Sequence, residues 1–242
     1  MSRDEPIFNV PGSVLAVLAL LIAVHVLLAA LPEDWGTWLL LALAFIPARY
    51  SGFANTLPGG EVAAVTSFLT YSVVHGGLVH LGLNAAWLVA FGTAVAKRVK
   101  AARFLLLSAF CAIVGAATFL MFNRGLMAPM VGASGAISGL MGATVRFLFS
   151  GIDADGLRAL RENPEDIPLM PLARALTDRR VIAVTGAFIL ANILGVLGVG
   201  GISAGSGIAW EAHMGGYFAG LLAFGFFDRR RSARSPDVAT QN

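Results

Sequence analysis

The sequence has little of what a soluble or disulfide-bonded protein carries. Only 13% of its residues are charged, whereas a soluble globular domain has about 25%, and this excludes an ordinary soluble fold. Its one cysteine, Cys111, excludes an internal disulfide and a cysteine-thiolate metal site. The opening stretch MSRDEPIFNVPG contains no apolar run, so we expect neither a signal peptide nor a transit peptide there.

Apolar residues make up most of the chain instead. They account for 57% of it and raise the mean hydropathy to +0.77. A helix needs about 20 mainly apolar residues to cross a bilayer. Six segments meet or approach this length: Val14–Leu31, Leu78–Val95, Ala102–Phe122, Ser134–Phe149, Val181–Val199 and Trp210–Phe227. The shorter run Gly36–Pro47 ends at proline and predicts an interfacial or re-entrant element of the first loop. We therefore predict an all-α, polytopic membrane protein with six transmembrane helices and a membrane-associated first loop.

Basic residues orient these six segments. An even number of crossings puts both termini on one side, and every lysine and arginine except Arg49 and Arg124 falls on or near that side. By the positive-inside rule, this side is cytoplasmic. The chain then divides into a cytoplasmic N-terminal segment (1–11), a six-span domain (12–227) and a cytoplasmic basic tail (228–242). The pI of about 9.5 is explained by this topology, and we expect no nucleic-acid partner.

The second span contains polar side chains near its outer end. It is entered through the stretch HGGLVHLGLN, which carries His75, His80 and Asn84. His80 and Asn84 are four residues apart and share one face of a helix. Polar side chains are costly in lipid, so these three residues are candidates for a functional site.

The fourth and sixth spans carry polar residues at a similar depth. The fourth begins at Ser134 within the stretch GASG. The sixth is entered through the stretch AWEAHMGGYFAG, where His213, Gly216 and Gly220 lie on one helix face. Taken alone, GASG is more often a site of small-residue helix packing than a catalytic motif. If Ser134 and His213 served only to pack helices, they would not be expected at the same depth as His80 and Asn84. The shared depth therefore favours a functional site.

The length of the fourth span predicts a buried serine. Ser134–Phe149 would be roughly 24 Å long, which is shorter than a hydrocarbon core of about 30 Å. We therefore expect this helix to begin below the outer surface of the membrane. A serine at a helix start lies near unpaired backbone N–H groups and the positive end of the helix dipole, an environment that can hold an oxyanion.

With these three motifs in this order, the chain resembles the rhomboid family of intramembrane serine proteases over its whole six-span region. The resemblance implies that Ser134 is the nucleophile and His213 the general base of a two-residue dyad. It also implies an oxyanion hole formed by His80, Asn84 and the Ser134 backbone N–H. Supporting positions around the site would be His75, Gly132, Gly135, Gly216 and Gly220.

Two features of the sequence depart from the family pattern. Many members have an aromatic residue four positions after the nucleophile, packed on the histidine ring, and here this residue is Ser138. The second span often ends with an acidic residue, and here it ends with Ala96. We expect Ser138 and Asn192 to make hydrogen bonds between helices.

The sequence offers no carboxylate for a full triad and no metal motif. Glu211 is the nearest acid to His213, but residues two apart on a helix point in different directions. His75 and His80 lack the H-E-x-x-H spacing of zinc proteases, so we expect neither a metal nor a cofactor.

The resemblance implies an endopeptidase that cleaves transmembrane segments of membrane proteins near the extracytoplasmic face. Its partners would be those substrates and membrane lipid, its location would be the bacterial inner membrane, and its oligomeric state stays open. Two other classes are considered. A pseudoprotease would bind membrane clients without cutting them, but such proteins usually lack the dyad. A small transporter would carry its polar residues near the bilayer midplane.

Overall fold

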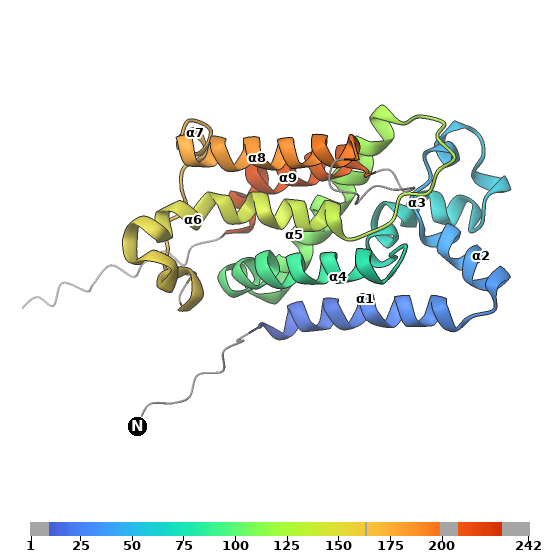
Figure 1. The fold of residues 1–242 in the computed structure, drawn as a ribbon, viewed down its shortest axis with the longest axis horizontal. Coiled ribbons are helices and arrows are strands. Elements are labelled where there is room, and N and C mark those ends of the chain that lie inside the picture. The colour runs from blue at the N-terminus through green and yellow to red at the C-terminus, as the bar shows by residue number, and fades with distance from the viewer. Residues whose placement is uncertain (1–9, 163, 199–207, 229–242) are drawn as a thin grey trace, which may run out of the picture.

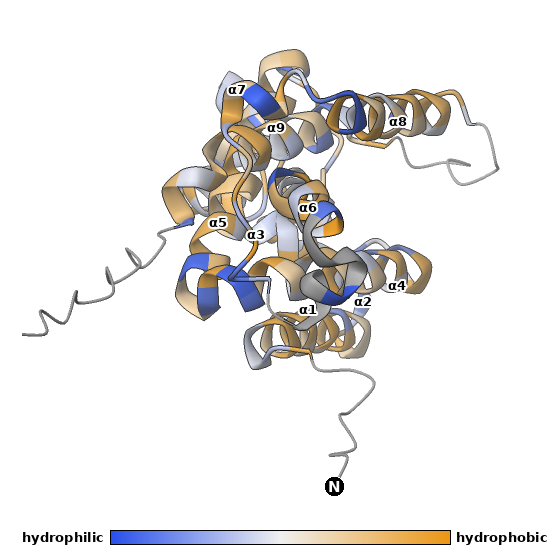
Figure 2. Ribbon diagram, turned by 90° about the vertical axis from the view of Figure 1, so that its left-hand side faces the viewer, coloured by the Kyte–Doolittle hydropathy of each residue, from blue (hydrophilic) through white to orange (hydrophobic). Residues whose placement is uncertain are grey.

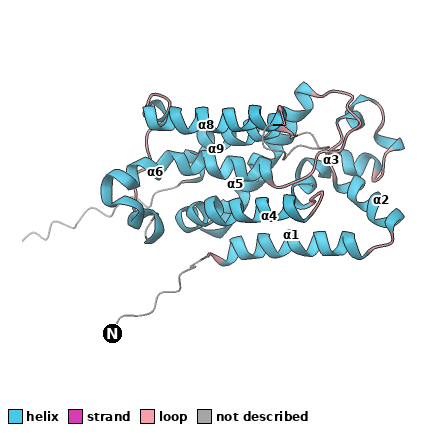
Figure 3. Ribbon diagram, viewed as in Figure 1, coloured by secondary structure: helices cyan, strands magenta, loops and turns pink. Residues whose placement is uncertain are grey.

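The computed structural model describes residues 10–162, 164–198 and 208–228 (Figure 1). Apart from Val10, Pro11 and Asp228, the two predicted cytoplasmic end segments lie outside these residues. The described residues form helices and no β-strand (Figure 3). The α-helices are α1 (Gly12–Ala30), α2 (Glu33–Leu43), α3 (Gly60–Thr70), α4 (Leu78–Trp87), α5 (Thr93–Phe122), α6 (Ser134–Glu162), α7 (Leu172–Ala175), α8 (Arg179–Val196) and α9 (Trp210–Phe227). The predicted all-helical fold is confirmed.

Four of the described segments are long and apolar enough to cross a membrane. They are α1, the 45 residues Leu78–Phe122, the Ser134–Asp153 part of α6, and α8. The 45-residue segment runs through α4, a π-helical turn at Leu88–Gly92 and α5, and its backbone leaves helical geometry at Lys100 (φ 69°, ψ 170°). Figure 1 shows the chain turning back there, so this segment passes through the bundle twice. The structure is that of an integral membrane helical bundle, while the count of six spans stays a prediction, since α9 is not among these four segments.

Two local expectations differ from the structure. The fourth helix was expected over Ser134–Phe149, but α6 continues to Glu162. Hydropathy marks where an apolar stretch ends, and a helix can continue beyond that point as a polar extension. The first loop was expected to hold one short element, yet it contains both α2 and α3, joined by 3₁₀ turns. The eleven residues of α3 are too few for a span, so hydropathy did not identify this helix.

The centre of the bundle consists of α5, α6 and α9, which make the most extensive contacts with one another. In the apolar window of α6, 78% of the residues are buried, against 11% in those of α1 and α8. Figure 2 shows α8 set to one side of the other helices. The central α6 therefore brings its first residue, Ser134, inside the protein.

One end of the bundle is held together by Arg98, which lies in α5 just before the kink at Lys100. Its guanidinium donates to the carbonyl oxygens of Pro164 and Ile167 at 2.7 and 2.9 Å. It also forms a buried ion pair with Asp228 at 2.7 Å. The kink in α5, the segment before α7 and the end of α9 therefore meet at this end.

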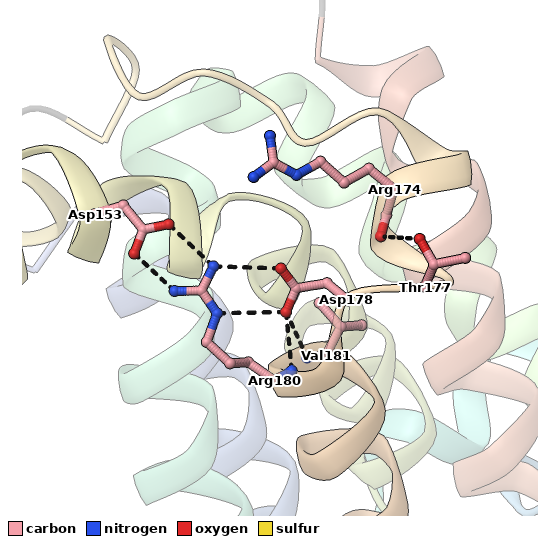
Figure 4. Close-up of polar contacts among 6 residues, drawn as sticks. All are labelled: Asp153, Arg174, Thr177, Asp178, Arg180 and Val181. Carbon is pink, nitrogen blue, oxygen red and sulfur yellow. Dashed lines mark hydrogen bonds and ion pairs between the residues drawn. The ribbon is translucent and has the colours of Figure 1, made fainter.

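The start of α8 lies at the same end of the bundle (Figure 1), and its polar contacts are drawn in Figure 4. This end holds Arg98, Arg174 and Arg180, and we call it the arginine-rich end. Asp178 caps α8 by accepting hydrogen bonds from the backbone N–H groups of Arg180 and Val181 at 2.9 and 3.4 Å. The Arg180 guanidinium bonds both Asp178, at 3.3 Å, and Asp153 of α6, at 2.7 and 3.0 Å. Hydrogen bonds from the Arg180 side chain, together with those backbone N–H groups, hold the pKa of Asp178 below its usual value. These contacts join α8 to α6 at the end of the bundle opposite Ser134.

Candidate active site

Ser134 is the first residue of α6, and the three residues before it set the position of its side chain. Gly132 has φ 117°, a left-handed conformation that favours glycine, and its N–H donates to the carbonyl oxygen of Tyr71 at 2.9 Å. The carbonyl oxygen of Ala133 accepts the first helical bond, from the Ile137 N–H at 2.9 Å. The N–H groups at the start of α6 therefore lack partners within the helix and lie beside the serine hydroxyl.

The hydroxyl of Ser134 is hydrogen-bonded to His213 of α9. Ser134 Oγ and His213 Nε2 are 2.7 Å apart, although 79 positions separate the two residues in the chain. Both side chains are partly buried. A serine oxygen at this distance from an imidazole nitrogen has the geometry of a nucleophile next to its base.

Glycines allow α9 to come this close to α6. A Cβ atom on Gly216 would overlap the carbonyl oxygen of Gly135, and one on Gly220 would overlap that of Gly139. The two backbones touch at both positions, so neither glycine can be replaced without moving a helix. The predicted supporting residues Gly135, Gly216 and Gly220 therefore lie between the helices that carry Ser134 and His213.

The other ring nitrogen of His213 is bonded to Asn192 of α8. His213 Nδ1 and Asn192 Oδ1 are 2.7 Å apart. Glu211, the acid nearest to His213 in the sequence, accepts a hydrogen bond from Asn123 Nδ2 at 2.9 Å instead. Sequence reasoning expected Asn192 to bond another helix, and the structure identifies its partner.

The predicted residues of α4 and the loop before it lie beside Gly132 and Ala133. A Cβ atom on Gly132 would lie 2.7 Å from both Cε1 and Nε2 of His80. His75 and His80 form an edge-to-face pair with ring centroids 5.1 Å apart, and His75 Nε2 accepts from the Ala133 N–H at 3.5 Å. Both histidines therefore border the backbone that leads into Ser134.

Asn84 is buried, with 5% of its surface exposed. Its Nδ2 donates at 2.9 Å to the carbonyl oxygen of His80, one turn earlier in the same helix. The amide nitrogen has a second hydrogen available for another acceptor. The role of Asn84 in an oxyanion hole stays a prediction.

Tyr71 was not identified from the sequence. It is 1% exposed, its hydroxyl donates to the carbonyl oxygen of Ala112 at 2.9 Å, and its own carbonyl oxygen accepts from Gly132. A Cβ atom on Gly135 would lie 2.7 Å from the Tyr71 hydroxyl oxygen. Tyr71 therefore contacts the start of α6 both before Ser134, at Gly132, and after it, at Gly135. Its position before the HGGLVHLGLN motif gave no sign of this contact.

Among the described residues, no three His, Cys, Asp or Glu side chains are grouped as a metal site would require. The expectation that the protein uses neither a metal nor a cofactor stays a prediction.

Fold and site together define a class of protein. It is an integral membrane helical bundle in which a serine at the start of a buried helix is bonded to a histidine on a neighbouring helix. Residues 62–156 match the family model of the rhomboid domain, a segment that includes Ser134, His75, His80 and Asn84. This part of the chain is similar to the rhomboid family. His213 lies outside the matched residues, so its pairing with Ser134 rests on the structure.

The rhomboid protease GluP of Bacillus subtilis (strain 168) is similar to part of this chain. The two are 40% identical over 75 residues, which make up 31% of this chain and 14% of that protein. The comparison therefore covers a small part of GluP, and it supports the family more directly than it supports a shared activity.

Proposed function

We propose that this protein is an intramembrane serine endopeptidase that cleaves transmembrane segments of other membrane proteins. The observation that carries the proposal is the 2.7 Å contact between Ser134 Oγ and His213 Nε2 within an apolar helical bundle. The match of residues 62–156 to the rhomboid domain supports it. The substrates would be membrane proteins because the dyad lies within a bundle of apolar helices.

The arrangement accounts for each step of peptide hydrolysis. His213 Nε2 takes the proton from Ser134 Oγ as the oxygen attacks the scissile carbonyl, and returns it to the leaving amine. The acyl-enzyme is then hydrolysed by water with the same histidine as base. The Ser134 N–H at the start of α6, assisted by His80 and Asn84, stabilises the oxyanion, and each such donor contributes about 10²–10³ in rate.

The position of the dyad supports an orientation in the membrane. Ser134 is the first residue of α6 and His213 lies in the first turn of α9. Both helices begin at the end of the bundle opposite the start of α8, which is the arginine-rich end (Figure 1). We infer six crossings with both termini in the cytoplasm, in a bacterial inner membrane, and cleavage near the extracytoplasmic face. The segment Leu78–Phe122 accounts for two of these crossings because it turns back within α5, and α9 is the sixth crossing.

The rival classes fit the geometry less well. A pseudoprotease does not need a serine hydroxyl bonded to an imidazole, and this chain has that bond. A transporter site is expected near the bilayer midplane at broken helices, whereas Ser134 and His213 lie at the beginnings of α6 and α9.

A cleavage assay in detergent tests the proposed function. The substrate is a single-span protein with small or helix-breaking residues near its outer end, since a helix must unwind before its peptide bonds can react. The wild-type chain is expected to cut it, with or without a chelator such as EDTA. Ser134→Ala is expected to leave the substrate intact at an unchanged melting temperature. Equal cleavage by both proteins would contradict the proposal, as would activity lost in EDTA and restored by zinc.

Asn84→Ala tests the oxyanion hole in the same assay. We expect kcat to fall by about 10²-fold while KM stays within about twofold, because the amide acts on charge that develops in the transition state. The matched control is Gly82→Ala on the same helix, where an added Cβ meets nothing within 4 Å. An unchanged kcat with a raised KM would remove Asn84 from this role.

A further inference from the structure

Both ring nitrogens of His213 are engaged, and the second contact points to a role for α8. Nε2 bonds Ser134 and Nδ1 bonds Asn192, each at 2.7 Å. We propose that Asn192 is a positioning residue that holds His213 in the tautomer and orientation that make it a base for Ser134. This inference rests on the proposed function, and it assigns to a neutral amide the place that a carboxylate takes in a three-residue triad.

The hydrogen bonds of Asn192 determine the tautomer of His213. Asn192 Nδ2 donates to the carbonyl oxygen of Phe188 at 2.8 Å, so its Oδ1 is the atom that faces His213. An amide oxygen only accepts hydrogen bonds, and Nδ1 of His213 must therefore carry the proton. In the neutral ring Nε2 then has a free lone pair, which points at the Ser134 hydroxyl.

The burial of Asn192 is unusual for its helix. Within α8, the buried residues are Val181 at the arginine-rich end and Asn192 near the opposite end. Asn192 is 8% exposed, whereas most of α8 faces outward. A polar side chain is costly in lipid, so its inward direction is explained by the bond that it makes.

His213 has little else to orient it. In the part of the chain that the structure describes, no aromatic ring stacks on its imidazole, although Phe188 and Tyr217 stack on each other nearby at 4.7 Å between centroids. Ser138, one turn after Ser134 on α6, is too small to supply a ring face. Its two hydrogen bonds are therefore the directional contacts that orient the imidazole in the described part of the chain.

A second bond between α8 and α9 offers a matched control. Thr185 Oγ1 and Tyr217 OH are 2.7 Å apart and join the same two helices without touching His213. Thr185→Val removes one α8–α9 hydrogen bond, as does Asn192→Leu, but leaves the imidazole contacts intact. If Asn192 served only to attach α8, the two variants would behave alike.

The experiment compares Asn192→Leu, Asn192→Asp and Thr185→Val with the wild-type full chain in detergent. Asn192→Leu is expected to lower kcat by about tenfold to a hundredfold, the range set by loss of a buried hydrogen bond, with KM within about twofold. Thr185→Val is expected to keep kcat within about twofold. Asn192→Asp keeps an acceptor and is expected to retain activity. The acidic limb of its pH–rate profile should move to higher pH, since the carboxylate stabilises the imidazolium.

A spectroscopic readout makes the test independent of turnover. In Ser134→Ala protein with ¹⁵N-labelled histidine, His213 is expected to show a protonated Nδ1, and Asn192→Leu is expected to remove this bias. Equal kinetics for Asn192→Leu and Thr185→Val, an unshifted profile for Asn192→Asp, or a protonated Nε2 would each overturn the proposal. A wild-type chain that does not cleave while its His213 shows the protonated Nδ1 would instead contradict the proposed function.

Discussion

Alanine in place of His213 is expected to abolish the reaction of Ser134 with a fluorophosphonate probe. Such a probe labels a serine only when a base raises its nucleophilicity. In the described residues, His213 Nε2 is the side-chain nitrogen bonded to Ser134 Oγ. We expect labelling to fall by at least about 10⁴-fold, as loss of the histidine does in other serine hydrolases. Mass spectrometry of the labelled protein should place the adduct on Ser134 alone.

Two further variants make this result specific. His80→Ala is expected to slow labelling without abolishing it, because the phosphoryl oxygen would lose one donor and keep the N–H groups at the start of α6. His25→Ala is expected to label like the wild-type chain, since in the described part of the chain the hydrogen bonds of Ser134 and His213 do not involve this α1 residue. Loss of labelling in His25→Ala together with full labelling in His213→Ala would show that the base had been assigned to the wrong helix.

Gly220→Ala is expected to destabilise the bundle although it adds a single methyl group. That methyl carbon would overlap the carbonyl group of Gly139 and lie 2.8 Å from its Cα. Backbone atoms cannot rotate away as a side chain can, so α6 and α9 would have to separate. Overpacking of this kind costs about 1–3 kcal/mol or more, and we expect the upper end of that range. The measurement is the melting temperature in detergent.

The matched control is Gly186→Ala on α8, where an added Cβ meets nothing within 4 Å. Alanine favours a helix over glycine by about 0.5–1 kcal/mol, so this variant is expected to melt at the same temperature or slightly higher. Separation of α6 and α9 would also break the contact between Ser134 and His213, and Gly220→Ala is expected to lose probe labelling as it loses stability. Equal melting temperatures for the two variants would contradict the close packing at Gly220.

Several features of the site were predictable because they depend on local properties of the chain. Ser134 was expected to be buried at a helix start because the apolar segment Ser134–Phe149 is too short for a full crossing. Close packing of α9 was expected from Gly216 and Gly220, which share one face. The extension of α6 to Glu162 and the helix α3 were not expected, because hydropathy reports the apolar core of a span and neither a polar extension nor a short helix.

The sequence by itself determined the helical class of the fold, the apolar segments and the places along them where polar residues occur. These follow from composition and from the 3.6-residue period of a helix, which are properties of neighbouring residues. The tertiary structure decided which helix faces meet. It placed Asn192 against Nδ1 of His213, turned Glu211 to Asn123, and set Tyr71 against the start of α6. These pairings depend on how each helix is rotated and which helix lies beside it, and spacing along one helix contains no information about either.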